Sequence, residues 1–99
     1  MFSTKLHKSY RDVVAICDLN LLGKKFEEGK KQLDVRENFF KDKEMDKKEL
    51  IIFLQFQKKE DATFNIVGPN SISAAQEAEV ISKENTGYVD GVPFALILA

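Results

Sequence analysis

The order of apolar and polar positions along the chain predicts a domain of mixed α and β structure. Residues 2–8 alternate loosely between apolar and polar side chains, as a half-exposed strand does. Residues 13–17 are continuously apolar, which is typical of a strand covered on both faces. Because a turn at residues 9–12 separates the two segments, we expect them to form a hairpin.

Two later segments have features of helices. Asp18 is placed to cap a helix over residues 19–28, and Gly29 is placed to end it. A capping-box sequence beginning at Asp46 predicts a second helix over residues 47–59, although the isoleucine and phenylalanine content there would also suit a strand.

The second of these helices would be apolar over more than one face. Leu50, Phe53 and Leu54 would point inward, leaving Ile52 and Phe56 on another face. These two side chains would cover either a second layer of the same core or a partner surface. A homodimer built on this face is one of the hypotheses that the sequence raises.

The stretch from 62 to 81 predicts a buried strand, a glycine-proline corner and a third helix. β-Branched and aromatic residues favour a strand that stops at Gly68, because the following proline has no amide for a ladder. Asn70 or Ser71 is placed to cap the helix, whose close-packing face carries Ala74, Ala75, Ala78 and Ile81.

The remaining segments complete the expected sheet. Residues 32–35 suit a short strand, and residues 36–45 a loop anchored by two phenylalanines. Tyr88-Val89 and the apolar segment 94–98 flank an Asp-Gly turn signal. We therefore predict one α+β domain over residues 1–99, with a mixed sheet of about five or six strands and about three helices packed on it.

Composition narrows the class of protein. At 99 residues, of which 43% are hydrophobic, the chain suits one globular domain. No apolar run is long enough to span a membrane and no signal peptide begins the chain, so we expect a cytoplasmic protein without membrane contact. One cysteine excludes an internal disulfide and a multi-cysteine zinc site, and no residue pattern predicts a metal or cofactor.

The charge is unevenly distributed although its sum is −1. Residues 1–59 carry 14 Lys and Arg against 10 Asp and Glu, while residues 60–99 carry 1 against 6. If folding keeps the two signs apart, a basic surface could meet RNA, a ribonucleoprotein or an acidic protein; if not, the charges form a dispersed solvated surface. The helix expected at 19–28 and its exit would bring four positive charges together, Lys24, Lys25, Lys30 and Lys31.

Catalytic chemistry has little support in the sequence. His7 and Cys17 are the only residues of their kinds, but in the expected hairpin His7 lies opposite Val13 and Cys17 opposite Ser3, about 13 Å apart. Phosphate-binding glycine loops and the Gly-x-Ser-x-Gly elbow are absent. No catalytic residue is predicted, and enzymatic activity stays an open alternative.

A small-ligand site is the alternative that the strand-to-helix corners suggest. Free backbone amides at the start of a helix can hold an anion, or they can be capped by the helix's own side chains. The groups that would converge on such a pocket are Asp18, Asn65, Gly68, Asn70, Ser71 and, less directly, His7.

The ordered set of short motifs resembles an archaeal family known as domain of unknown function 424. The resemblance covers nearly the whole chain and rests on Lys5-Leu-His7, Val14-Ala-Ile-Cys-Asp18, Leu21-Leu-Gly-Lys24, Phe26-Glu-Glu-Gly29, Leu33-Asp-Val35, Asn38-Phe-Phe40, Asn65-Ile-Val-Gly68 and Gly91-Val-Pro-Phe94. It implies a small archaeal cytoplasmic protein of mixed α and β structure, with no established activity to carry over. A non-enzymatic binding module that uses the basic N-terminal portion is the leading hypothesis.

Overall fold

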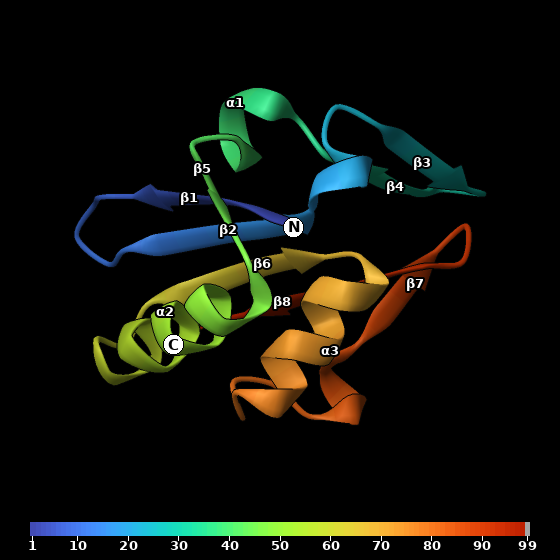
Figure 1. The fold of residues 1–99 in the computed structure, drawn as a ribbon. Coiled ribbons are helices and arrows are strands. Elements are labelled where there is room, and N and C mark those ends of the chain that lie inside the picture. The colour runs from blue at the N-terminus through green and yellow to red at the C-terminus, as the bar shows by residue number, and fades with distance from the viewer. Residues whose placement is uncertain (99) are drawn as a thin grey trace.

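The computed structural model of the protein describes residues 1–98. They form a six-stranded mixed sheet in the order β5-β1-β2-β6-β8-β7 and a separate two-stranded sheet, β3-β4 (Figure 1). The strands are β1 Phe2–His7, β2 Val13–Asp18, β3 Lys25–Glu28, β4 Lys31–Asp34, β5 Lys43–Met45, β6 Thr63–Val67, β7 Gly87–Val89 and β8 Val92–Ile97. The helices are α1 Glu37–Phe40, α2 Lys47–Lys59 and α3 Pro69–Glu77, with 3₁₀ turns at Leu19–Leu21 and Lys83–Asn85. The predicted α+β class is confirmed.

The centre of the sheet is the parallel pair β2 and β6, and each neighbouring pair outside it is antiparallel. The hairpin of β1 and β2 has the predicted register, with His7 opposite Val13 and Ser3 opposite Cys17. The last strand, β8, lies between β6 and β7. The C-terminal apolar segment is therefore an inner strand.

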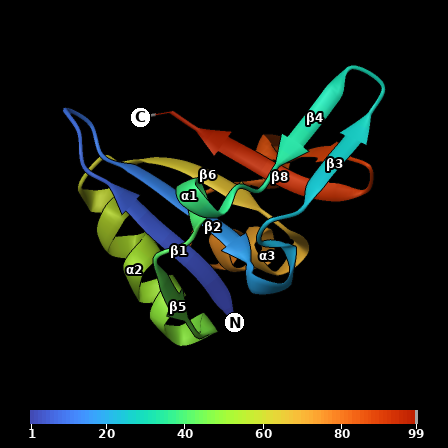
Figure 2. The ribbon, with the colours of Figure 1, turned by 90° about the horizontal axis from the view of Figure 1, so that it is seen from above.

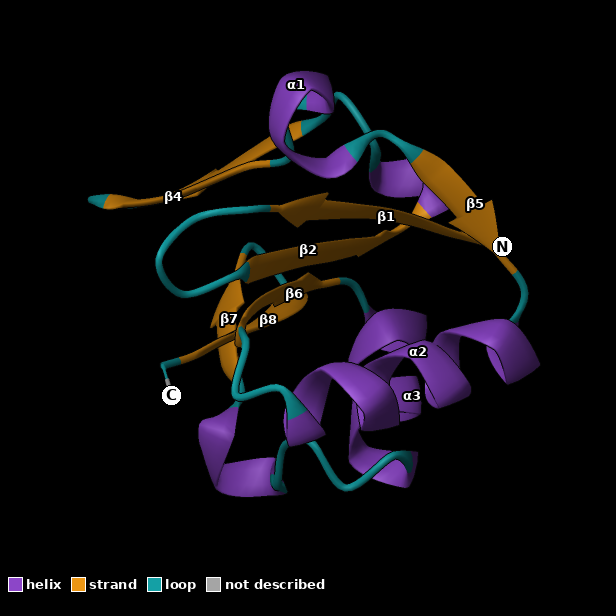
Figure 3. Cartoon of the chain, turned by 90° about the vertical axis from the view of Figure 1, so that its left-hand side faces the viewer, coloured by secondary structure: helices purple, strands orange, loops and turns teal. Residues whose placement is uncertain are grey.

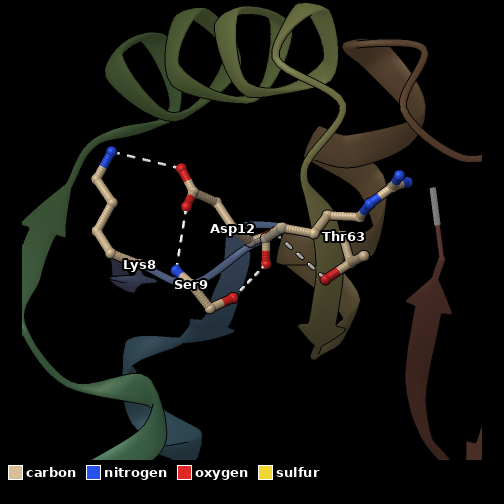
Figure 4. Close-up of polar contacts among 5 residues, drawn as sticks. Lys8, Ser9, Asp12 and Thr63 are labelled. Atoms are coloured by element: carbon tan, nitrogen blue, oxygen red, sulfur yellow. Dashed lines mark hydrogen bonds and ion pairs between the residues drawn. The ribbon is translucent and has the colours of Figure 1, made fainter.

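Asp12 closes the turn between β1 and β2 and ties it to β6 (Figure 4). Its carboxylate accepts from the Ser9 amide at 3.4 Å and lies 3.4 Å from Lys8 Nζ. Its carbonyl accepts from the Thr63 amide at 2.9 Å. The turn thus fixes where the parallel pairing of β2 and β6 begins, at Val13 and Thr63.

The two faces of the sheet are covered differently (Figures 1 and 3). Helices α2 and α3 cover one face, and the larger core lies beneath them, with Ile16 and Ile66 packed against Leu50 and Leu54. The short helix α1 and the β3-β4 sheet lie over the opposite face, where Cys17 belongs to a smaller cluster. We name these the helical face and the open face.

Helix α2 has the predicted capping box, and Leu50, Phe53 and Leu54 pack toward the core as predicted. Asp46 Oδ1 accepts from the Glu49 amide at 2.8 Å, and Glu49 Oε1 accepts from the Asp46 amide at 3.1 Å. Ile52 and Phe56 are 68% and 58% exposed. The expectation that they cover a second layer of the core is wrong, because one layer of Leu50 and Leu54 already fills the space above the sheet.

The predicted helix over residues 19–28 is also wrong. The segment forms a 3₁₀ turn and then strand β3, in which Phe26 lies opposite Leu33 of β4. Gly23 and Gly29 have φ angles of +85° and +61°, which interrupt a helix and allow the two turns. Likewise, the loop expected at 36–45 contains α1 and β5.

Helix α3 confirms the alanine face. Ala74, Ala75 and Ala78 are all buried in the larger core, so the helix backbone lies close to the sheet. The helix begins at Pro69, and its N-cap position is Gly68 rather than Asn70 or Ser71. Among residues 1–98, no helix has the length and apolar character needed to cross a membrane.

Candidate functional site

The predicted ligand corner, Asp18 with residues 68–71, is assembled at the start of α3. Asp18 ends β2 and is 3% exposed. Its Oδ1 accepts from the amide and the hydroxyl of Ser71, both at 2.7 Å. Its Oδ2 accepts from the amide and the side-chain Nδ2 of Asn70, both at 3.1 Å. A carboxylate from another strand therefore caps this helix.

These contacts define what the corner can do chemically. A negative charge at the start of a helix is stabilised by the free amides and by the helix dipole. Here the chain's own Asp18 carboxylate provides that charge, and it uses the Asn70 and Ser71 amides that an external anion would need. An external anion would have to displace Asp18 from four donors.

Gly68 leaves space for this carboxylate. Its φ of +111° is a conformation that residues with a side chain rarely adopt. A Cβ placed on Gly68 would lie 2.5 Å from Asp18 Cγ. The glycine is therefore required by the close approach of Asp18 as well as by the backbone.

The other two residues predicted for this pocket lie elsewhere. Asn65 is on β6 between Ala15 of β2 and Leu96 of β8, and it lines a groove on the open face. His7 Nε2 donates to the Phe39 carbonyl at 2.8 Å, and the two rings stack with centroids 4.5 Å apart. His7 thus holds α1 over the sheet and does not join the corner.

Cys17 is buried on the open face beneath α1 and is fully inaccessible to solvent. Burial, with the neighbouring Asp18 carboxylate, raises the pKa of the Cys17 thiol to about 12. His7 lies opposite Val13, and Cys17 is four residues further along β2. The arrangement gives a neutral, inert thiol and no Cys-His pair.

The predicted lysines lie on a projecting element. We name residues 24–34 the β3-β4 arm, which extends beyond the edge of the main sheet (Figure 2). Lys24 and Lys25 are at its base, and Lys30 and Lys31 are at its tip next to Gly29. All four side chains are exposed, although the helix that was expected to carry them is absent.

The three acidic side chains of the arm already have partners. Glu27 lies 3.6 Å from Lys25 Nζ, Asp34 lies 3.0 Å from Arg36 Nε, and Glu28 accepts from the Asp90 amide at 2.7 Å. Within residues 1–98, Lys24, Lys30 and Lys31 have no acidic partner within 4 Å. The Asp90 amide does not neutralise Glu28, so the charges on the arm without an opposite charge within 4 Å are three lysines against one carboxylate, and their sum is positive.

Asn65 lines a groove that was not among the sites predicted from the sequence. The groove has a volume of about 270 Å³ and lies between the arm, α1 and the strands β6 and β8. A signal for it is present in the sequence: β6 reads Thr-Phe-Asn-Ile-Val, and an asparagine in the middle of an apolar inner strand is unfavourable unless its amide has a role.

Residues 7–99 match the family described as "Protein of unknown function (DUF424)". The chain belongs to this family. The match covers nearly all of the fold, including the corner, the arm and the groove. The resemblance seen in the ordered motifs is thereby confirmed, and it brings no activity with it.

A solved structure supports the fold. The crystal structure of an uncharacterized conserved protein from Methanopyrus kandleri is similar to this chain with a TM-score of 0.83. The likeness covers 97% of this chain and 89% of that chain at 20% sequence identity. At that identity it establishes the fold alone. No curated protein matches the chain.

Proposed function

We propose that this family member is a non-enzymatic binding module that contacts RNA through the β3-β4 arm. The observation that carries the proposal is the charge state of the arm. Each of its three acids is held by a partner within the chain, whereas Lys24, Lys30 and Lys31 are exposed and have none among the described residues. Lysines placed in this way neutralise phosphates and release counterions.

The shape of the arm supports an extended partner. Strands β3 and β4 have four residues each, so about 13 Å separates the base lysines from the tip lysines. Positive charges spread over such a length suit a chain of phosphates better than a single carboxylate. The arm projects from the sheet, so its lysines can reach a partner that the rest of the domain does not enclose (Figure 2).

The lysines of α2 form a second set of four on the helical face. Lys47 Nζ lies 3.3 Å from Glu77, and Lys58 Nζ donates to the Glu79 carbonyl at 2.7 Å. Both contacts join α2 to residues of α3 and its exit, which belong to the acidic C-terminal part of the chain. Among the described residues, one of the four α2 lysines, Lys47, and one of the four arm lysines, Lys25, lie within 4 Å of a carboxylate, so the two sets differ in position rather than in the number of paired charges.

The experiment is an anisotropy titration of a fluorescent single-stranded RNA of mixed sequence at several salt concentrations. With three to four phosphate contacts we expect log K to fall with log salt at a slope of about −2 to −3. A variant with glutamine at all four arm lysines should bind weakly and show a slope near zero. Glutamine keeps most of the side chain and removes the charge.

A matched control replaces four lysines of α2 on the helical face. The variant with glutamine at Lys47, Lys48, Lys58 and Lys59 has the same net charge as the arm variant, and it should keep the wild-type slope. Equal loss in both variants would show that only net charge matters and would contradict a role for the arm. Binding of a polyglutamate peptide in place of RNA would assign the arm to an acidic protein.

A further inference from the structure

The open face carries a groove at the root of the arm. Its floor is formed by β6 and β8, including Asn65, and its walls by Leu33 and Asp34 of β4 and by Phe39 of α1. At about 270 Å³ it is smaller than the sites that hold drug-sized ligands. It suits one planar group the size of a nucleobase.

Asn65 is the polar group on the floor. Its side chain is partly exposed, and within the described residues neither its amide nitrogen nor its oxygen has a hydrogen-bond partner in the protein. Its neighbours across the sheet are Ala15 and Leu96, which offer it no polar contact. The amide therefore presents one donor and one acceptor, side by side, to whatever enters the groove.

The walls favour an aromatic ligand with an amino group. Phe39 and Phe94 line the groove, and aromatic side chains stack on the faces of unpaired bases. The ring of Phe39 is held in place by His7 on one side and by Phe40 at its edge. Asp34 also lines the groove; its Oδ2 accepts from Arg36 Nε, which leaves its Oδ1 to accept from an exocyclic amine.

These features favour adenine over the two pyrimidines. An asparagine amide pairs in bidentate fashion with the N6 amine and N7 of adenine. Uracil has no exocyclic amine to donate to the Asp34 carboxylate. Cytosine has the amine but the smaller stacking surface of a pyrimidine.

We propose that the groove binds an unstacked adenine base, with Asn65 reading the base edge and Phe39 and Phe94 contacting its faces. The proposal rests on the RNA-binding function of the arm. Asp34 is the last residue of β4 and also lines the groove. An RNA strand whose phosphates lie along the arm lysines therefore reaches the groove at the base of the arm. The arm then supplies affinity for the RNA phosphates, and the groove supplies the preference for adenine.

The test is an anisotropy titration of three labelled octanucleotides, all-adenine, all-cytosine and all-uracil RNA, with wild type and with Asn65→Ala. We expect wild type to bind the adenine strand about tenfold more tightly than the uracil strand. Asn65→Ala should reduce that ratio to near one and leave the affinity for the uracil strand unchanged. Asn20→Ala, an exposed asparagine that does not line the groove, should keep the wild-type ratio.

The outcomes separate the groove from the arm. Equal affinity of wild type for all three strands would overturn the adenine site and leave the arm proposal standing. No binding to any strand would overturn both. A parallel titration with adenosine monophosphate distinguishes the source of the base: if the mononucleotide binds through Asn65 and the strands do not, the RNA assignment is wrong. Thermal melting of Asn65→Ala checks the fold, which should be unaffected because that side chain makes no hydrogen bond.

Discussion

Replacing Asp18 by alanine tests the structural role of the corner at the start of α3. The carboxylate accepts four hydrogen bonds from Asn70 and Ser71 and joins the end of β2 to the helix. Asp18→Ala removes the acceptor for all four at once. Ser71 is fully buried, so water cannot replace the lost partner of its amide and hydroxyl without a rearrangement.

The expected cost follows from these contacts. Loss of a helix cap costs about 1 kcal/mol, and a buried donor left without an acceptor costs about 1–3 kcal/mol. With two such donors on Ser71, we expect the free energy of unfolding to fall by about 4 kcal/mol. For a domain of this size that corresponds to a decrease in Tm of roughly 20 °C.

The assay is urea unfolding followed by circular dichroism, with two further variants. Asp18→Asn keeps one oxygen for Ser71 but turns its amide NH₂ group toward the Asn70 donors. Its free energy of unfolding should therefore fall by about half as much as that of Asp18→Ala. Asp42→Ala removes an exposed acid from the link between α1 and β5, and its free energy of unfolding should stay within about 0.5 kcal/mol of wild type.

A loss below about 1 kcal/mol for Asp18→Ala would contradict a capping role for this carboxylate. It would mean that the amides at the start of α3 do not depend on this carboxylate. The corner would then be available to an external anion, and the small-ligand alternative would become the better account. Phosphate titration of that variant would be the next measurement.

Three other changes probe the same structure. Gly68→Ala should destabilise the domain by about 2 kcal/mol or more in urea unfolding, because its φ is +111° and its Cβ would meet Asp18; wild-type stability would contradict the geometry. The raised pKa of Cys17, about 12 against an ordinary 9.0, means that the folded state holds the thiol proton more tightly. The stabilising contribution of the protonated thiol is complete below pH 9.0 and is lost as the pH rises toward 12, so the free energy of unfolding of Cys17→Ala should fall less steeply with pH over that range than that of wild type. Iodoacetamide should label native wild type at pH 8 far more slowly than unfolded protein. Deleting residues 95–99 removes half of the inner strand β8 and should abolish cooperative melting; a sharp transition in the truncated protein would show that β6 and β7 do not need it.

Local signals predicted much of the fold. The register of β1 and β2 follows from a short turn between an alternating and an apolar segment, and both are adjacent in the sequence. The capping box at Asp46 uses atoms three residues apart, so its sequence pattern is sufficient. The alanine face of α3 is set by helical spacing.

Contacts between distant segments could not be predicted in the same way. The 19–28 segment has leucine and phenylalanine four residues apart, as a helix would, but Val35 exchanges hydrogen bonds with Gly23 and Lys24 and holds it in an extended arm. Asp18 was expected to cap the helix directly after it, whereas its partners lie 52 and 53 residues further along the chain. The groove likewise depends on three separate segments meeting over β6.

An NMR titration of the isotope-labelled protein with adenine-containing single-stranded RNA would locate the binding surface residue by residue. If RNA binds the arm and the groove, we expect shift changes in the arm amides, residues 24–34, and around Asn65 and Phe39 on the open face, with α2 and the corner at Gly68 unchanged. Shift changes confined to the exposed α2 face at Ile52 and Phe56, or no changes at low salt, would contradict this expectation.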